Sequence, residues 1–331
     1  MTELSDVPLS VLDLAPISEG GDAARSLRNS VDLARHTESL GYHRYWLAEH
    51  HNMPGIASSA TVVMIGRVAA ATEQIRVGSG GVMLPNHAPL VVAEQFGTLE
   101  AFHPGRIDLG IGRAPGTDQR TAFALRGPSA LSAEDFPQQL TELMGYFEHD
   151  ERRGVNAVTA EGNRPPIWLL GSSDFSARLA GMLGLPFSFA HHFSARNTVP
   201  ALAAYRESFR PSTVLESPHA MVAASVICAD TDEQARRLAG PGLLSFLSLR
   251  RGRPIPLPTP EQAADFPYSD LEQKFLQERR AGSIVGSPDT VRAGLDALLA
   301  GTDSDELMIT TMVHDHEDRR RSYELLAKLA R

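Results

Sequence analysis

Histidine side chains stand directly after short apolar runs at several places in this chain of 331 residues. His50 follows the run Trp46-Leu47-Ala48 and has Glu49 beside it. An imidazole gains and loses its proton near neutral pH, so a histidine at a strand end can act as an acid or a base in catalysis. The simpler alternative is a buried histidine hydrogen-bonded to backbone, with Glu49 as a structural carboxylate. His50 alone is compatible with both interpretations.

A run of small residues at Gly78, Ser79, Gly80 and Gly81 could let a ligand approach the backbone. Glycine weakens a strand, because it has no side chain to pack, unless another group must come close to the main chain. A planar ligand lying on this segment would be such a group. A β-bulge at the rim of a sheet would use the same residues, so both explanations stay open.

An anion could bind where Gly171, Ser172, Ser173 and Ser176 open a helix. The first N–H groups of a helix have no partner within it, and the helix dipole favours negative charge there. Ser173 and Ser176 are three residues apart, so both hydroxyls can face one phosphate. Arg113 leaves a glycine-rich strand end and is also suited to phosphate. The alternatives are a plain serine cap and a surface arginine, and we favour the phosphate site.

Two pairs of histidines raise the question of a metal ion. His191 and His192 are adjacent, and adjacent residues of a strand point to opposite faces. His314 and His316 would share a face, as in metal-dependent barrel hydrolases. Those enzymes usually carry a matching pair on their first strand, where this chain has only Asp13. We expect no metal, and we keep a hydrolase as an alternative of another class.

These residues fall where short apolar runs end, and the runs alternate with amphipathic stretches. The runs predict strands at residues 9–15, 45–48, 75–77, 106–111, 166–170, 187–190, 220–229 and 307–313. The amphipathic stretches predict helices at residues 23–40, 59–72, 90–102, 136–147, 173–183, 198–209, 232–239, 287–299 and 317–329.

This alternation predicts an α/β fold with a parallel sheet, and the number of units predicts a closed (β/α)8 TIM barrel. The rival is a doubly wound sheet, but no linker divides the chain into halves. We expect one domain over residues 1–331. In a barrel the carboxyl ends of the strands meet at one face, so the residues named above should converge there.

Two long segments interrupt the alternation, residues 112–164 after the fourth strand and residues 240–283 after the seventh. The second is rich in glycine and proline, and we predict a mobile loop that closes over the site. It also holds Arg250, Arg251 and Arg253, which could grip an anionic substrate or form a solvated surface.

Composition limits the partners of the protein. A net charge of −9 argues against general nucleic-acid binding, which needs a basic surface. No apolar run approaches the roughly 20 residues that span a bilayer, and the first residues lack the basic region of a signal peptide. A single cysteine, Cys228, allows no internal disulfide. We expect a cytoplasmic protein without a membrane partner.

Taken together, the motifs resemble bacterial luciferase and its relatives. The similarity spans residues 7–192 and continues more weakly to the end of the chain. No single motif is specific, but the set is. The matching motifs are Trp46-Leu47-Ala48-Glu49-His50-His51, residues 75–85, Glu94-Gln95, Gly105-Arg106-Ile107, Gly110-Ile111-Gly112-Arg113 and Gly184-Leu185-Pro186.

The resemblance implies a barrel that binds FMN over the strand ends. It implies that His50 is the catalytic histidine, near the reacting edge of the flavin. It also implies a cis peptide bond between Gly80 and Gly81 beneath the ring system.

By the same resemblance, Arg113, Ser173 and Ser176 hold the flavin phosphate, in agreement with the residue-level argument. Ser172 stands where the luciferase pattern has a glutamate, which leaves its role open. We expect the cofactor to be bound by Gly78, Ser79, Gly80, Gly81, Arg113, Gly171, Ser172, Ser173, Ser176 and His191.

The family reaction uses reduced FMN, made by a separate flavin reductase, and O2 to oxygenate a small organic substrate. The lack of a credible nicotinamide motif agrees with a separate reductase. One alternative is an F420-dependent dehydrogenase on the same barrel, whose anionic cofactor would need more basic residues than Arg113. Another is a flavin-binding protein without turnover. The resemblance further implies a homodimer through helices near the second and third units, where residues 61–71 are apolar.

Overall fold

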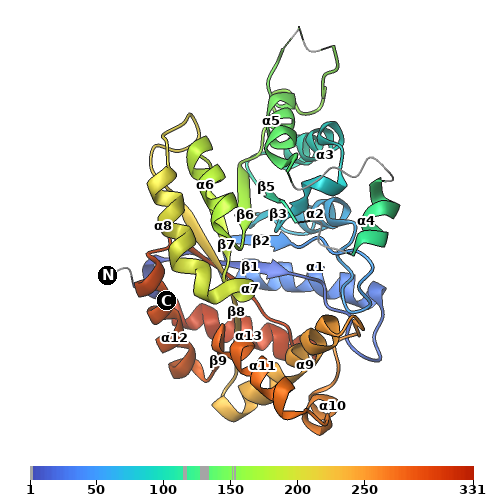
Figure 1. The fold of residues 1–331 in the computed structure, drawn as a ribbon, viewed down its shortest axis with the longest axis vertical. Helices are drawn as coiled ribbons and strands as arrows, with labels where there is room; N and C mark the ends of the chain where they lie inside the picture. Colours follow the sequence, from blue (N-terminus) through green and yellow to red (C-terminus); the bar gives the residue numbers. More distant parts are fainter. Residues whose placement is uncertain (1–2, 115–117, 127–133, 151, 153) are drawn as a thin grey trace.

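Eight parallel strands close into a barrel in the computed structural model of the chain, which describes residues 3–331 except 115–117, 127–133, 151 and 153 (Figure 1). The last strand, Glu306–Thr310, pairs on one side with Leu9–Asp13, the first strand, and on the other side with Ala220–Cys228. These two pairings close the sheet. The predicted (β/α)8 TIM barrel is thereby confirmed. The strands of the ring are β1 (Leu9–Asp13), β2 (Arg44–Leu47), β3 (Arg76–Ser79), β5 (Ile107–Gly112), β6 (Ile167–Gly171), β7 (Phe187–Ala190), β8 (Ala220–Cys228) and β10 (Glu306–Thr310).

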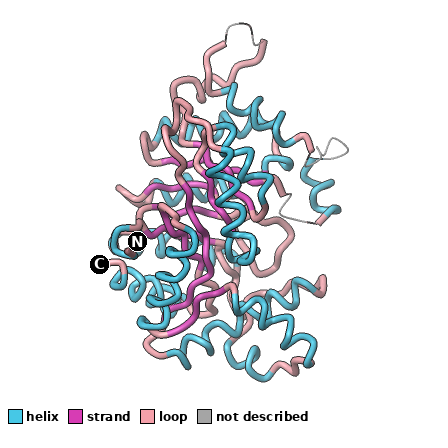
Figure 2. The backbone as a smooth tube through the Cα atoms, turned by 60° about the vertical axis from the view of Figure 1, so that its left-hand side comes forward, coloured by secondary structure: helices cyan, strands magenta, loops and turns pink. Residues whose placement is uncertain are grey.

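Helices surround the barrel on its outer side (Figure 2). Each predicted helix is present, with ends that differ from the prediction by a few residues or, after β8, by more. Among the described residues, no helix combines the length and the apolar character of a membrane-spanning segment. The helices are α1 (Ala23–Ser39), α2 (Thr61–Ala69), α3 (Pro89–Phe102), α4 (Gln119–Arg126), α5 (Phe136–Tyr146), α6 (Asp174–Leu183), α7 (His191–Ser194), α8 (Thr198–Ser208), α9 (Asp232–Arg250), α10 (Pro260–Asp265), α11 (Asp270–Ala281), α12 (Pro288–Thr302) and α13 (His316–Leu329).

Successive residues of each strand alternate between the helices and the barrel interior. On β1, Val11 packs in the large core between strands and helices, whereas Leu12 packs inside the barrel with Trp46 and Trp168. The two indole rings meet edge to face, with centroids 5.4 Å apart. Because both faces of the strands are buried, the strands occur in the sequence as continuous apolar runs.

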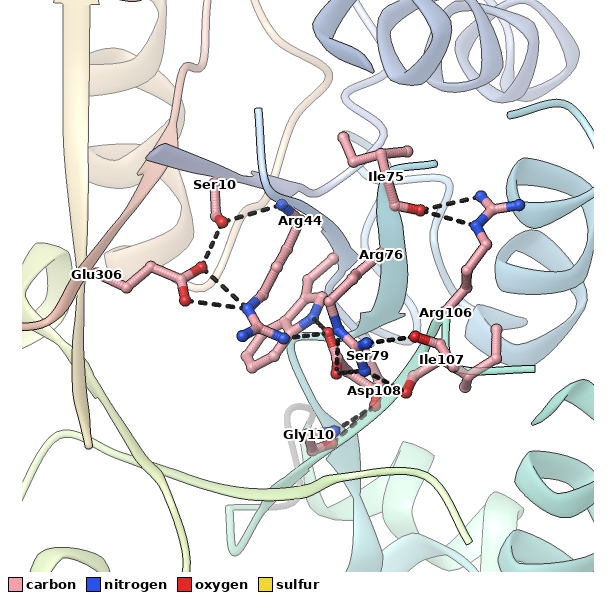
Figure 3. Close-up of polar contacts among 12 residues, drawn as sticks. Ser10, Arg44, Ile75, Arg76, Ser79, Arg106, Ile107, Asp108, Gly110 and Glu306 are labelled. Atoms are coloured by element: carbon pink, nitrogen blue, oxygen red, sulfur yellow. Dashed lines mark hydrogen bonds and ion pairs between the residues drawn. The ribbon is translucent and has the colours of Figure 1, made fainter. Parts of the chain in front are cut away.

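Charged side chains fill the amino-terminal end of the barrel interior (Figure 3). The guanidinium of Arg44 on β2 lies 2.8 Å from the carboxylate of Asp108 on β5 and 3.0 Å from that of Glu306 on β10. Arg76 on β3 lies 2.6 Å from the other oxygen of Asp108, and Ser10 on β1 donates to Glu306. These five residues, here called the floor network, join five strands. Their charges are paired and hydrogen-bonded, as buried charges must be.

The segment 240–283 is not the loop that its glycines and prolines predicted. α9 continues through Pro241 to Arg250, α10 and α11 follow, and β9 (Ser283–Gly286) pairs with β8. Pro241 is buried inside α9. A Cβ on Gly240 would lie 3.2 Å from Cβ of Ala263 in α10, so the glycine permits close helix packing. Tertiary packing therefore outweighs the poor helix propensity of glycine and proline.

The segment 112–164 contains the expected helix, α5, and a second one, α4, that was not predicted. Residues 115–117, 127–133, 151 and 153 of this segment lie outside the described residues. A short strand, β4 (Val82–Met83), pairs with β5 and precedes α3.

Candidate active site

A cavity of about 800 Å³ lies at the carboxyl ends of the barrel strands. Interior residues of several strands form part of its lining, for example Leu12, Ala48 and Leu170. Residues of α9 and of the segment 254–257 line it as well. A concave site with mostly apolar walls and a few polar groups is typical of small-molecule binding. The carboxyl ends of several strands therefore meet at one cavity.

His50 lines this cavity just after the end of β2. Its backbone N–H donates to the carbonyl of Ser58 at 3.2 Å. Its Nδ1 is buried and has no hydrogen-bond partner among the described residues. Burial lowers the pKa of His50, and the charge of Glu49 only partly offsets this effect. The side chain is thus a neutral imidazole at neutral pH, with a nitrogen left for a bound molecule.

Glu49 has the opposite surroundings. Its Oε1 lies 2.9 Å from Nε2 of His51 and 2.8 Å from Nε2 of His87, and its Oε2 accepts from the N–H of Met83 at 3.0 Å. Burial alone would raise the pKa of this carboxyl, but the hydrogen bonds from His51 and His87 lower it to about 2. We interpret Glu49 as the structural carboxylate that ties the end of β2 to β4.

Gly80 and Gly81 line the cavity and are joined by a cis peptide bond, as the resemblance implied. A Cβ on Gly80 would lie 2.5 Å from Cδ1 of Leu12, and one on Gly81 would lie 2.8 Å from the carbonyl oxygen of Gly110. No larger residue fits at either position without displacing its neighbours. The two glycines leave bare backbone at the base of the cavity.

Gly78 and Ser79, the other two members of this run, do not line the cavity. A Cβ on Gly78 would lie 2.8 Å from Nε1 of Trp46 in the barrel interior. The Ser79 hydroxyl donates to the carbonyl of Gly110 at 2.8 Å and accepts from its N–H at 3.0 Å. Both residues build the strand below the cavity rather than its surface.

Gly171, Ser172, Ser173 and Ser176 line the cavity where α6 begins. Ser173 is the N-cap residue, but its side chain makes no capping hydrogen bond, so the hydroxyl is not used as a plain cap. A Cβ on Gly171 would lie 2.7 Å from Cβ of Ser176, which is buried. The glycine therefore lets the first turn of α6 come close to the end of β6.

Arg113 lines the same cavity after β5. Its guanidinium carbon lies 4.3 Å from the ring centroid of Phe175, the second residue of α6. This cation–π contact brings the positive charge to the start of the helix. Arg113, Ser172, Ser173 and Ser176, here called the phosphate cradle, combine a cation, three hydroxyls and free helical N–H groups. Such a set suits a phosphate.

The histidines after β7 differ from expectation, because His191 and His192 open α7 instead of ending a strand. His191 is not among the residues that line the cavity, and its Nδ1 lies 2.8 Å from the hydroxyl of Thr198. His192 does line the cavity. Its Nδ1 lies 2.8 Å from the carbonyl oxygen of Ala223, and burial lowers its pKa to about 4. The helical turn thus brings His192, not His191, to the cavity.

The hydrolase alternative needs His314 and His316 to share a site. His314 instead lies against a backbone carbonyl and His316 against a surface carboxylate, and neither lines the cavity. In the described part of the chain, three metal-capable side chains meet only at Glu49, His51 and His87, where the imidazoles are hydrogen-bonded to the carboxylate. The geometry gives no support to a hydrolase.

Arg250, Arg251 and Arg253 do not line the cavity, and Arg251 forms an ion pair with Glu272 of α11. They belong to the solvated surface, the second of the two predicted alternatives.

Three other arginines do line the cavity: Arg236 on α9, and Arg279 and Arg280 on α11. Arg279 and Arg280 could not be predicted from the sequence, because residues 240–283 have the composition of a loop. Arg236 lies in the predicted helix 232–239, but the sequence does not show that this helix reaches the cavity. Capping boxes that begin at Thr259 and Ser269 open α10 and α11. This spacing of serine or threonine before glutamate or glutamine was a readable sign of helix starts.

Comparison with known proteins bears on this site. The sequence profile described as luciferase-like monooxygenase matches residues 7–305. A protein of Escherichia coli (strain K12) named luciferase-like monooxygenase is 50% identical over 320 residues, which cover 96% of each chain. An N-acetyl-S-alkylcysteine monooxygenase of Bacillus subtilis (strain 168) is 35% identical over 329 residues, which cover 97% of each chain.

Solved structures agree with these matches. The crystal structure of apo-MsnO8 is 39% identical, covers 98% of both chains and has a TM-score of 0.91. Two more distant structures share the fold. One is the oxygenating constituent of 3,6-diketocamphane monooxygenase from Pseudomonas putida in complex with FMN, 19% identical with a TM-score of 0.70 over 98% and 97% of the two chains. The other is an F420-dependent secondary alcohol dehydrogenase, 12% identical with a TM-score of 0.67 over 98% and 99%.

Proposed function

The chain belongs to the luciferase-like monooxygenase family, and on that premise we propose that it is an FMN-dependent, two-component monooxygenase. A separate flavin reductase supplies reduced FMN. The enzyme uses this FMN and O2 to oxygenate a small organic substrate. N-acetyl-S-alkylcysteines are the first compounds to try, because a relative that is 35% identical is named for them.

One observation carries the proposal: the phosphate cradle and His50 line a single cavity. The cradle suits the anionic end of FMN, and Gly80 and Gly81 line the cavity, where a flat ring system can lie against their backbone. The unpartnered Nδ1 of His50 is a polar atom that a bound molecule would satisfy. A buried nitrogen without a partner is costly, and a bound molecule that forms a hydrogen bond there would remove this cost.

Each group then has a defined task. When bound, FMN supplies the electrons that activate O2. The cradle holds the phosphate by charge and by hydrogen bonds, and the glycines admit the ring. His50 accepts or delivers a proton at Nδ1, a task suited to an imidazole that is neutral at neutral pH. The apolar walls keep water away from the reacting atoms.

The test is an anaerobic titration of the protein with reduced FMN, followed by rapid mixing with oxygenated buffer. We expect saturable binding, and after mixing a transient absorbance that belongs neither to reduced nor to oxidised FMN. Binding without such a transient would shift the assignment toward hydride transfer. Absence of reduced-FMN binding would overturn the proposal and leave the family and the fold.

A second candidate is an F420-dependent dehydrogenase. It is favoured by Arg236, Arg279 and Arg280, because the cavity holds more positive charge than Arg113 alone. The decisive comparison is binding of F420 and of FMN to the same preparation. Tight F420 binding with hydride transfer to or from an alcohol, and weak reduced-FMN binding, would replace the first proposal.

We also infer a homodimer through α2 and α3. A shallow apolar groove lies between these helices, lined in part by Val62, Leu99 and Phe102. Val63 of α2 and Phe102 of α3 are 72% and 76% exposed, which is unfavourable for a monomer in water. A second copy of the chain can cover both by presenting the same face.

A further inference from the structure

Arg279, near the end of α11, brings a positive charge into the cavity wall without a matching negative charge. Its guanidinium donates to the backbone carbonyl of His192. It forms no ion pair with any carboxylate among the described residues, although it is partly buried. Burial lowers the pKa of Arg279, and no neighbouring acid opposes this effect.

The two buried arginines of the described chain, Arg44 and Arg319, have acid partners instead. Arg44 lies 2.8 Å from Asp108 and 3.0 Å from Glu306, and Arg319 lies 2.7 Å from Asp13. In both cases the acids raise the pKa of the arginine against the effect of burial. A guanidinium has five N–H donors, and a single carbonyl uses few of them. Arg279 therefore has unused donors in the wall of a cavity, which is how an anion site is built.

The surroundings of this charge are apolar. The guanidinium carbon of Arg279 lies 4.6 Å from the ring centroid of Phe246 on α9. Phe246 in turn stacks on Phe275 of α11, with the rings nearly parallel and their centroids 5.7 Å apart. Leu243 and Leu249 of α9 line the same cavity. An occupant that satisfies Arg279 must also tolerate contact with an aromatic and aliphatic wall.

We propose that the substrate is an organic anion with an apolar body, and that Arg279 binds its anionic group while Phe246 and its neighbours contact the apolar part. The assignment rests on the proposed function, because the anion is the molecule to be oxygenated. Arg279 is then a specificity-determining residue supplied by the helical segment between β8 and β9.

The flavin phosphate is the other anion to consider at this position. Its cradle has its own cation, Arg113, which follows β5 and stacks on the first turn of α6. Arg279 is fixed to the carbonyl of His192 at the start of α7, after β7. The two arginines thus reach the cavity from opposite sides of β6, which lies between β5 and β7. Two of the four arginines that line the cavity are thus fixed at separate places, which suits two anions.

The experiment compares two fluorescent probes that share one ring system, titrated into the full-length chain. Anilinonaphthalene sulfonate is an apolar anion, and N-phenylnaphthylamine is the same body without the charge. We expect Arg279→Met to weaken sulfonate binding by at least about tenfold, since a charge-assisted hydrogen bond is lost. Binding of the neutral probe should change by less than about twofold, and Arg279→Lys should recover part of the sulfonate affinity.

Arg250→Met is the matched control, because Arg250 ends α9 but does not line the cavity. It should leave both probes unaffected. If Arg279→Met lowers the affinity for both probes equally, Arg279 serves only to hold α11 in position, and the proposal is overturned. Equal wild-type affinity for the two probes, or no binding of the sulfonate, would also overturn it.

Two further measurements separate the substrate from the cofactor. Reduced FMN should bind Arg279→Met as it binds the wild type, and a tenfold loss there would assign Arg279 to the cofactor instead. Arg113→Met should keep its sulfonate affinity, and a loss seen only in that variant would place the anion in the phosphate cradle. Failure of the wild type to bind reduced FMN would overturn the proposed reaction, whereas the probe comparison would still decide whether Arg279 binds an anion.

Discussion

Glu49 and His50 follow each other in the chain, yet their side chains have opposite hydrogen-bonding states. Glu49 has a partner for each oxygen, whereas Nδ1 of His50 has none among the described residues. The carboxylate is therefore fixed in place, and the imidazole is left for a bound molecule. This division of roles between adjacent residues is the basis for two predictions.

His50→Ala is expected to reduce turnover by about 10²-fold or more, because general acid–base catalysis contributes about that much. Reduced FMN should still bind within a few fold of the wild type, since the phosphate cradle is untouched. Oxygen-dependent turnover and anaerobic titration measure the two quantities separately. His149→Ala is the control, because His149 is 66% exposed and outside the cavity. Unchanged turnover in His50→Ala would remove this residue from the mechanism.

Glu49 should make the protein sensitive to acid. Its pKa is about 2 in the folded chain and 4.5 in the unfolded reference. A lowered pKa stabilises the fold fully above pH 4.5, and the stabilisation is lost as the pH falls from 4.5 toward 2. The difference corresponds to about 3 kcal/mol at most. Urea unfolding of the wild type and of Glu49→Gln across this range should give two curves that converge in acid, and parallel curves would contradict the assignment.

Among single residues, the sequence predicted a place in the cavity correctly where the residue type and its sequence neighbours were sufficient evidence. His50, Gly80, Gly81, Arg113 and the serines of α6 all line the cavity, and the cis bond is present. The sequence could not show that the helical turn after β7 brings His192, and not His191, to the cavity. It also could not show Arg279, because a cavity-facing arginine is defined by the fold around it and not by its sequence neighbours.

Among the elements, α6 depends on one glycine for its position. Gly171→Ala would place a Cβ 2.7 Å from Cβ of Ser176 and so displace the first turn of the helix. Overpacking costs about 1–3 kcal/mol, and we expect the affinity for reduced FMN to fall by roughly tenfold. Gly154→Ala is the control, since nothing lies within 4 Å of the added atom. Normal FMN binding by Gly171→Ala would show that the cradle does not hold the cofactor.

The strands and most helices were predictable because buried parallel strands are apolar throughout and the helices show a regular apolar period. The second part of α9, from Gly240 onward, was not predicted, because Gly240, Pro241 and Gly242 are poor helix formers and favoured a loop. The helix persists because α10 packs against it and the segment after β10 lies close to it. A Cβ on Gly242 would lie 3.4 Å from the carbonyl oxygen of Met312. Such contacts join distant parts of the chain, and a local pattern cannot contain them.

For the whole molecule, the floor network should govern stability. Asp108 pairs with both Arg44 and Arg76 and also accepts from Nε1 of Trp46 at 3.0 Å. Asp108→Ala leaves the buried Arg44 and the half-buried Arg76 each short of a partner, and we expect the free energy of unfolding to fall by about 3–5 kcal/mol. Asp296→Ala, on the exposed face of α12, should change it by less than about 0.5 kcal/mol. Urea unfolding measures both, and equal effects would argue against the network.

The proposed homodimer through α2 and α3 can be tested by one substitution. Phe102→Asp on α3 should convert a homodimer into a monomer by placing a charge in the apolar face, and light scattering after gel filtration would report the mass. Leu271→Asp is the matched control, because Leu271 is 78% exposed but lies on α11, away from α2 and α3. A wild type that is already monomeric would overturn the inferred dimer.

The floor network and the pair of tryptophans fill the barrel beneath the cavity, so a molecule reaches the cavity from the carboxyl ends of the strands. The cofactor and the substrate would then enter through the same opening. In the function that we propose, FMN lies against His50 and the paired glycines and the substrate binds above it, so the flavin must enter first. A substrate molecule that binds before reduced FMN would block the entry of the flavin. Turnover should therefore pass through a maximum and decline as substrate becomes abundant, and raising the supply of reduced FMN should move that maximum to higher substrate concentration.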